Sequence, residues 1–343
     1  MIGAEEIRPG IVHHVSQDEI LGSVGPRVVA SQDGGETWST LCELPFSQPR
    51  RSLSYSPVLR RYARALVYHL LPVDESTLLA IGARQIFCID RAKGRVRSTE
   101  PLVGSHPLAV CTAGQRIYYG VYSVAPGDEE SRILCSNDGG ASWETAATVP
   151  GVRHIHGIFT DPYADALWVT TGDADDESWL LRCTPDFARI EKVLGGSQDR
   201  RIVQPVFTED AIYFGSDSPH LDNQIYRFDR ASGDIEAQVS VGNSVFFGTK
   251  VADEVFFGTA IEPSWRRHDR RVRLWHRGPR SWKPIWSAAR PLALSWLCYP
   301  RILFPAGAGD ESHVWWSALG TRNDQRMCRL PLEAVHEAAE NVP

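Results

Sequence analysis

The sequence has no hydrophobic run long enough to cross a bilayer, which takes roughly 20 apolar residues. Its beginning, MIGAEEIRPGIVHH, lacks the basic start and the apolar segment of a signal peptide. The 7 cysteines show no C-x-x-C spacing of the kind found in zinc or redox sites. These absences predict a cytoplasmic protein that does not interact with a membrane.

Lysine is also scarce, and only four of the 36 basic residues are Lys. The 42 acidic residues outnumber the basic ones and give the chain a formal net charge of −6. Such a mild excess of negative charge argues against general binding to the nucleic-acid backbone. We therefore expect no nucleic-acid partner, whereas the sequence leaves the oligomeric state open.

Helical periodicity is nearly absent before LEAVHEAAE at 332–340, which predicts a short terminal helix. The rest of the chain repeats a pattern of four short apolar strands separated by polar turns. These repeats cover residues 11–45, 63–101, 106–150, 154–195, 201–241, 244–288 and 292–332. Radial stacking of such units predicts an all-β, seven-bladed β-propeller of four-stranded antiparallel blades, with residues 1–343 as one domain. The last repeat has no obvious fourth strand.

Two of the predicted turns, SQDGGETW at 31–38 and SNDGGASW at 136–143, share a Ser, an Asp, paired glycines and a Trp. A short carboxylate can accept hydrogen bonds from its own turn, and glycine permits positive φ. We therefore interpret Asp33, Trp38, Asp138 and Trp143 as structural residues. Both turns resemble the Asp-box, or BNR repeat, of sialidase-like β-propellers. That resemblance implies a turn between the third and fourth strands, on the rim away from the substrate.

The opposite face, where first strands begin and second strands end, is the predicted site. His154 and His156 start a first strand, and their i, i+2 spacing points both imidazoles to the same side. Two interpretations remain open at this stage. The imidazoles could hold a divalent metal such as Zn, Mn or Fe, with His69, His220 or Gln204 as a third ligand. Alternatively, one of them could act as a general base near neutral pH.

Catalysis on a glycan needs further groups at the same face. Hydrolysis requires two carboxyl groups, for which the loops after second strands offer Asp173 and Glu262. The His- and Arg-rich face is also similar to that of propeller lyases acting on uronates. That similarity implies that Arg153 or Arg201 neutralises the uronate, that His154 or His156 removes the C5 proton, and that Tyr163 or Tyr226 protonates the leaving oxygen.

The remaining polar residues at this face are predicted to contact the substrate. They are Arg64, His69, His106, Gln204, Asp217, His220, Trp265, Arg266 and Arg267. The arginines suit pairing with carboxylate groups. The sequence therefore predicts a carbohydrate-active protein, a glycoside hydrolase or polysaccharide lyase acting on an acidic glycan. The alternative is a carbohydrate-binding or protein-assembly module without turnover.

Overall fold

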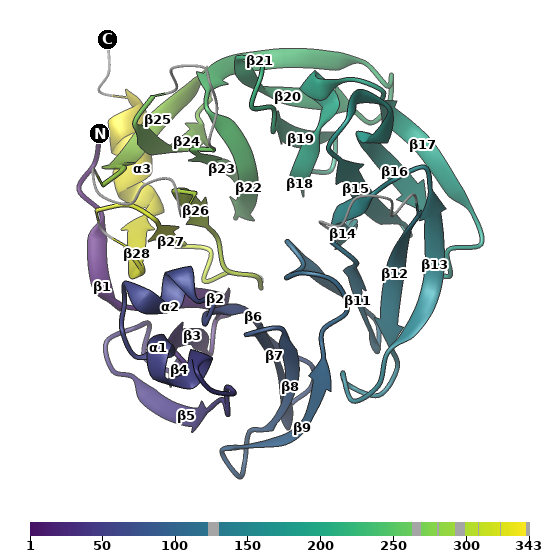
Figure 1. Ribbon diagram of the computed structural model, residues 1–343. Coiled ribbons are helices and arrows are strands. Elements are labelled where there is room, and N and C mark those ends of the chain that lie inside the picture. The colour runs from purple at the N-terminus through teal and green to yellow at the C-terminus, as the bar shows by residue number, and fades with distance from the viewer. Residues whose placement is uncertain are drawn as a thin grey trace.

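The computed structural model describes residues 1–122, 130–262, 269–279, 281–291, 299–307, 309–322 and 324–340. Strands β1 to β28 dominate this part of the chain. Figure 1 shows their sheets arranged in a ring, with strands β6, β14, β18 and β22 toward the centre and strands β5, β9, β13, β17 and β21 on the outside. Every strand pairing between neighbours is antiparallel. The expectation of an all-β, propeller-like fold is thus confirmed.

Five sheets contain four strands each, in sequence order. The first contains β2 (Ile11–Val15), β3 (Ile20–Val24), β4 (Arg27–Ser31) and β5 (Ser39–Glu43), and the second contains β6 (Val67–Pro72), β7 (Thr77–Gly82), β8 (Gln85–Asp90) and β9 (Arg95–Pro101). The third contains β10 (Val110–Ala113), β11 (Arg116–Gly120), β12 (Glu130–Ser136) and β13 (Glu144–Pro150). The fourth contains β14 (His154–Thr160), β15 (Leu167–Gly172), β16 (Trp179–Cys183) and β17 (Ile190–Gly195). The fifth contains β18 (Ile202–Phe207), β19 (Ala211–Ser216), β20 (Asn223–Asp229) and β21 (Ile235–Gly242).

The sixth sheet has eight strands and contains both ends of the strand series. One half comprises β22 (Ser244–Val251), β23 (Glu254–Ala260), β24 (Arg271–Arg277) and β25 (Trp282–Ala289). The other half comprises β26 (Arg301–Leu303), β27 (His313–Leu319), β28 (Arg326–Pro331) and the N-terminal strand β1 (Glu5–Pro9). Within the described residues, one pair in the strand ladder, Ala260 with Arg301, joins the two halves. Strand β1 pairs antiparallel with β28 and so supplies the fourth strand that the last repeat lacked.

The second strand of each sheet lies between two neighbouring sheets and is almost entirely buried. In β7, all six residues of TLLAIG are buried. Leu78 and Ala80 pack with side chains of the first sheet, whereas Leu79 and Ile81 pack with side chains of the third. This alternation follows from the two-residue period of a strand, and it explains the continuous hydrophobic runs in the sequence. The outer strand β9 instead alternates exposed and half-buried residues.

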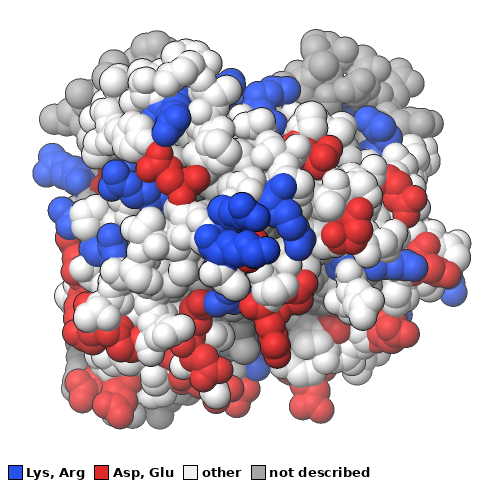
Figure 2. All heavy atoms as spheres, turned by 90° about the horizontal axis from the view of Figure 1, so that it is seen from below, with Lys and Arg blue, Asp and Glu red and all other residues white. Residues whose placement is uncertain are grey.

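The few helices lie at the margins of the ring. Helices α1 (Arg50–Ser54) and α2 (Leu59–Tyr62) connect the first and second sheets. Helix α3 (Leu332–Glu340) follows β28, and its Leu332 and Val335 join the hydrophobic core around Trp316. Among the described helices, none is long and apolar enough to span a membrane. One side of the ring carries both charge signs, with Lys and Arg near the centre of the view and acidic groups along its lower edge (Figure 2).

The two Asp-box turns are closed by their own residues. Asp138 lies between β12 and β13, where its carboxylate accepts hydrogen bonds from Ser142 N (2.9 Å) and from the Ser136 hydroxyl (2.8 Å). Asp33 accepts the equivalent bonds from Thr37 N (2.9 Å) and the Ser31 hydroxyl (2.7 Å). The Thr37 hydrogen bonds lower the pKa of Asp33 to about 2.

The tryptophans complete both turns, since Trp38 Nε1 donates to Gly35 O and Trp143 Nε1 donates to Gly140 O. The second glycine of each box packs on the preceding sheet. A Cβ on Gly140 would come within 2.1 Å of Leu79 Cδ1, and one on Gly35 within 2.9 Å of Trp315 Cη2. These hydrogen bonds therefore stabilise the two turns, and the second glycine of each turn allows close packing between sheets.

Candidate functional site

Three neighbouring sheets place charged residues at equivalent positions. Asp173 and Asp217 directly follow the second strands β15 and β19, and Glu262 lies two residues after β23. Arg153 and Arg201 directly precede the first strands β14 and β18. Because first and second strands are antiparallel, the start of one lies beside the end of the other. The repeat therefore brings these residues to one end of the sheets, beside the first and second strands.

Asp173 is the hub of this group. Its Oδ2 lies 2.8 Å from Arg153 Nη2, and its Oδ1 lies 2.9 Å from Arg201 Nη2. Nε2 of His154 and of His156 lie 3.3 Å and 3.7 Å from the same Oδ1. Burial alone would raise the pKa of Asp173, but the contacts with His154 and His156 and the charge on Arg201 outweigh it and hold the pKa well below its usual range. Asp173 is therefore ionised.

The two histidines are fixed by backbone and ring contacts, and each is 2% exposed. His156 Nδ1 donates to Ile202 O over 2.8 Å, which directs Nε2 toward Asp173. Burial lowers the pKa of His156, so its neutral form predominates at pH 7. A Cβ on Gly172 would lie 2.5 Å from His156 Cε1, so the glycine gives the imidazole its space.

Asp217 is a carboxyl group with the opposite protonation tendency. It is 2% exposed, and its Oδ2 lies 3.3 Å from the same Nη2 of Arg201 that contacts Asp173. Burial and the negative charge of Glu262 raise the pKa of Asp217 well above its usual value. Glu262 itself accepts a hydrogen bond from the Ser244 hydroxyl over 2.7 Å. One arginine thus contacts an ionised carboxylate and a carboxyl group whose pKa is raised.

Tyr122 also belongs to the group, although the sequence analysis did not select it. Its ring stacks on His154 with 4.2 Å between centroids. Burial and the charges of Asp173 and Asp217 raise the pKa of Tyr122, so its hydroxyl keeps its proton. Tyr122 lies two residues after the second strand β11, as Glu262 does after β23. The register of the repeats could therefore have identified it. We call these eight residues the inner cluster: Tyr122, Arg153, His154, His156, Asp173, Arg201, Asp217 and Glu262.

The two predicted tyrosines lie elsewhere, so their assignment to the site was wrong. Tyr163 is 41% exposed in the turn between β14 and β15, at the opposite end of the strands, where its hydroxyl accepts a hydrogen bond from Lys250 Nζ. The turn between the first and second strands lies at the same end of a sheet as the turn between the third and fourth strands. This is because successive turns of an antiparallel sheet alternate between its two ends. Tyr226 is in the middle of β20, stacked on Phe214 and covered by the Arg200 guanidinium.

The metal prediction depends on His154, His156 and Asp173, whose donor atoms lie within 4.8 Å of one another. Imidazole and carboxylate suit first-row transition metals. However, two guanidinium groups already neutralise Asp173 and would repel a divalent cation. His69 and His220, the other predicted ligands, are not in this group.

The remaining predicted residues are dispersed. Gln204 donates from Nε2 to Gly248 O and links β18 to β22. The backbone N–H of His220, on an exposed loop, donates to the Ser218 hydroxyl. Arg64 precedes β6, His69 lies in β6, and His106 precedes β10. All three are thus at or before the first strands of the second and third sheets. Trp265, Arg266 and Arg267 fall outside the described residues.

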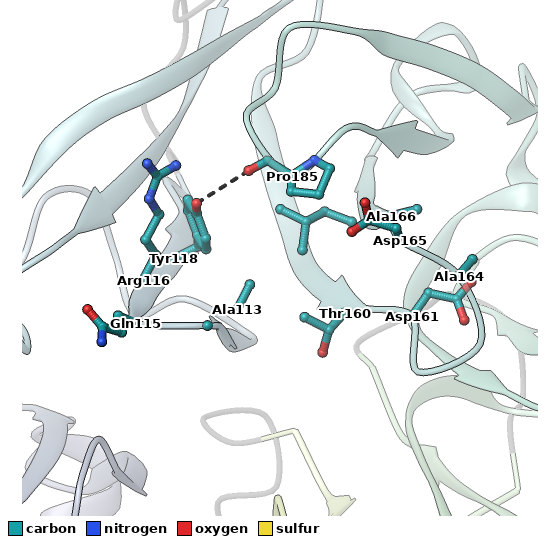
Figure 3. A pocket seen from close by; sticks show the side chains of 12 residues that line it. Ala113, Gln115, Arg116, Tyr118, Thr160, Asp161, Ala164, Asp165, Ala166 and Pro185 are labelled. Atoms are coloured by element: carbon teal, nitrogen blue, oxygen red, sulfur yellow. Dashed lines mark hydrogen bonds between the residues drawn. The ribbon is translucent and has the colours of Figure 1, made fainter.

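A cavity of about 450 Å³ lies at the Asp-box end, away from the inner cluster. Arg116 and Tyr118 line one side of it, and Thr160, Asp161 and Asp165 line another (Figure 3). The Tyr118 hydroxyl donates to Pro185 O at its rim. None of the predicted site residues lines this cavity, so we do not assign the inner cluster's chemistry to it.

Comparison with known proteins supports the fold and does not extend to activity. No protein-family model and no curated protein matches the sequence. Among solved structures, a chain of the Mitotic Checkpoint Complex has a TM-score of 0.61 at 11% identity, over 96% of this chain and 90% of that one. Hydrazine synthase from Kuenenia stuttgartiensis has a TM-score of 0.55 at 13% identity, over 81% and 80%.

A third similar structure is the extracellular domain of a putative hybrid two-component system from B. thetaiotaomicron. Its TM-score is 0.59 at 11% identity, over 95% of this chain. The present chain spans 39% of the length of that protein. At such identities these similarities show a shared propeller-like architecture alone.

Proposed function

We propose that this protein is a carbohydrate-active enzyme that uses acid–base catalysis at the inner cluster, on an acidic glycan. One observation carries the proposal: Arg201 contacts both Asp173 and Asp217, whose pKa values move in opposite directions. Two carboxyl groups held in different protonation states supply an acid and a base at one pH. A purely structural ion pair has no need of a protonated partner.

Glycoside hydrolysis uses this pair most directly. Asp217 gives its proton to the glycosidic oxygen as the C–O bond breaks, and ionised Asp173 activates water or stabilises the positive charge at the anomeric carbon. In the alternative elimination, neutral His156 would take the C5 proton of a uronate. Exposure favours Asp173 over the histidines as the base, because its side chain is 28% exposed whereas those of His154 and His156 are 2% and 1% exposed; the Asp217 side chain is 3% exposed.

An acidic glycan is favoured by the arginine at the edge of the cluster. The Arg153 side chain is 38% exposed, yet it is oriented by its 2.8 Å contact with Asp173. An oriented guanidinium can accept a second carboxylate partner from the substrate. The resemblance of the two turns to Asp-boxes adds support for a carbohydrate ligand and for membership of the sialidase-like propellers.

A non-catalytic binding module is the second candidate. The burial of both histidines favours it, since buried groups contact a ligand poorly. Such a module would bind the same glycan through Arg153 and Asp173 without turnover. The checkpoint-complex structure is an example of a similar fold within an assembly.

The test is a screen of acidic polysaccharides for reducing ends and for unsaturated ends. We expect new reducing ends, and Asp217→Asn should lower the rate by about 1,000-fold while the protein stays folded. Asp138→Asn is the matched control on the Asp-box face and should retain full activity. Unsaturated products would identify a lyase. Binding without any product would favour the non-catalytic module.

Two structural details complete the proposal. We assign seven blades, because one residue pair joins the two halves of the eight-stranded sheet and seven clusters of buried side chains separate neighbouring units. We also propose a cytoplasmic location, which suits the six buried free cysteines in the described part of the chain.

A further inference from the structure

Strands β2, β6 and β26 lie across the centre of the ring from strands β14 and β15 (Figure 1). Apolar side chains pack together at these strands, since buried Ile11, Leu66 and Leu319 contact Tyr68 and Leu303. The Tyr68 ring stacks on His106, with 4.3 Å between centroids and 17° between planes. A flat aromatic pair therefore lies beside a small hydrophobic cluster.

Two arginines lie near this aromatic pair, Arg64 before β6 and Arg301 in β26; after burial, the charges of both lower the pKa of His106. Arg64 and Arg301 each lie two residues before a member of the hydrophobic cluster, Leu66 and Leu303 respectively. Within the described ranges, no ion pair joins either guanidinium to a carboxylate, and Arg301 Nη1 donates to Tyr299 O over 3.3 Å. In the inner cluster, by contrast, Arg153 and Arg201 both contact Asp173. Among the described residues, Arg64 and Arg301 are thus not paired with a carboxylate.

The neighbouring histidines do not add to the charge of these two arginines at neutral pH. Burial and then the charge on Arg301 lower the pKa of His106 to about 3. Burial also lowers the pKa of His69, which is hydrogen-bonded through Nε2 to Pro107 O over 2.8 Å. The two guanidinium groups are therefore the source of the positive field.

The backbone at Arg64 is in the left-handed region. Its φ is +51°, and it directly follows Ala63, the C-cap of helix α2. Glycine is the usual residue in this left-handed position, because a Cβ is unfavourable there. Arg64 thus occupies a position where glycine would fit the backbone better.

We propose that Arg64, Arg301 and the stacked Tyr68–His106 pair form a binding subsite for a carboxylate-bearing sugar ring. Guanidinium groups pair with the carboxylate, and the aromatic pair covers the apolar face of the ring. The inference rests on the proposed function, since it places one acidic sugar across the ring from the residues assigned to bond cleavage. It names the substrate class as a uronate oligosaccharide.

Calorimetric titration with trigalacturonate tests the subsite, with the methyl-esterified trisaccharide as the uncharged probe. We expect wild type to prefer the acidic trisaccharide, and Arg64→Gln with Arg301→Gln to weaken its binding by about 10- to 100-fold. Arg64→Gly should also weaken binding while its Tm stays equal or rises, because glycine relieves the backbone strain. The double variant Arg97→Gln, Arg182→Gln removes the same charge from exposed strand positions and should bind normally.

Several results would overturn the subsite. They are equal affinity for both trisaccharides, no binding of either, arginine variants within twofold of wild type, or an equal loss in the Arg97, Arg182 control. Asp217→Asn separates this inference from the proposed function, because it should bind trigalacturonate like wild type. If Asp217→Asn keeps its turnover while the arginine variants lose binding, the acid–base proposal fails and the subsite stands.

Discussion

Asp138 and Asp173 are both hydrogen-bonded aspartates in loops that follow a strand, but their partners come from different distances along the chain. The partners of Asp138 are Ser136 and Ser142, within four residues and in the same turn. The partners of Asp173 include Arg153 and Arg201, which precede the first strands of two different sheets. One carboxylate stabilises its own turn, and the other requires the assembled ring.

The difference indicates how to distinguish a structural from a functional aspartate in a repeated fold. A carboxylate that accepts its hydrogen bonds from its own turn does not need partners from the rest of the protein. Asp33 and Asp138 also have a lowered pKa, so the pKa alone does not distinguish the two kinds of aspartate; charged partners from several sheets do, and perturbed groups of that kind concentrate at functional sites. Four predictions follow the contrast, from the largest expected change in stability to the smallest.

Arg201→Met should break the inner cluster most severely. The side chain is 11% exposed, and its loss leaves Asp173 and Asp217 without their shared partner. We expect the free energy of unfolding to fall by about 3 kcal/mol in chemical denaturation. Arg182→Met, at an exposed position of β16, is the control. A loss below about 0.5 kcal/mol would show that the cluster holds its charges without Arg201.

Gly140→Ala should break the Asp-box side. The new Cβ would meet Leu79 Cδ1 at 2.1 Å, at a residue with φ of +92°. We expect a loss of about 2 kcal/mol in denaturation experiments. Gly139→Ala shares the positive φ, but its Cβ meets only Val73 Cγ1 at 3.7 Å. Equal losses in the two variants would mean that backbone strain, and not packing between sheets, governs this turn.

The pH dependence of stability should separate Asp173 from Asp217. The pKa of Asp173 is lowered in the folded state, so its contribution is present above about pH 3.9, the unfolded value, and is lost as pH falls. The pKa of Asp217 is raised, so its contribution is present below about pH 3.9 and is lost as pH rises.

Thermal melts between pH 3 and pH 7 can measure both signs. Asp173→Asn should reduce the loss of Tm as the pH falls toward 3. Asp217→Asn should raise Tm above that of wild type by more at pH 7 than at pH 3. Parallel profiles for the two variants would contradict the assignment of one ionised and one protonated carboxyl group.

Asp33→Asn should have the smallest effect. The carboxylate is at the surface, and the amide oxygen can still accept from Thr37 N and Ser31 Oγ. We expect Tm to fall by less than about 3 °C, with unchanged turnover on any substrate found. A loss of turnover would connect the Asp-box face to the site.

The sequence was sufficient for the repeated strands and for the turns at 31–38 and 136–143, because strand periodicity and turn chemistry are local. His154, Asp173 and Arg201 were found in this way, since each lies at a strand end that the repeat register fixes. Tyr163 was misassigned because the sequence does not show at which end of the sheet this tyrosine lies. The raised pKa of Asp217 depends in part on the negative charge of Glu262. The two residues belong to different sheets, and no local sequence pattern shows that they lie close together.

The pairing of β1 with β28 has a consequence for biosynthesis. The residue Glu5 meets Arg329, so the contact joins segments more than 300 residues apart. Ring closure therefore depends on a segment that is translated more than 300 residues after β1, and β1 must wait with unpaired edges until then. A circular permutant that starts before β2 and carries β1 after β28 would make this contact local. Such a protein should close its ring faster without any change in the inner cluster.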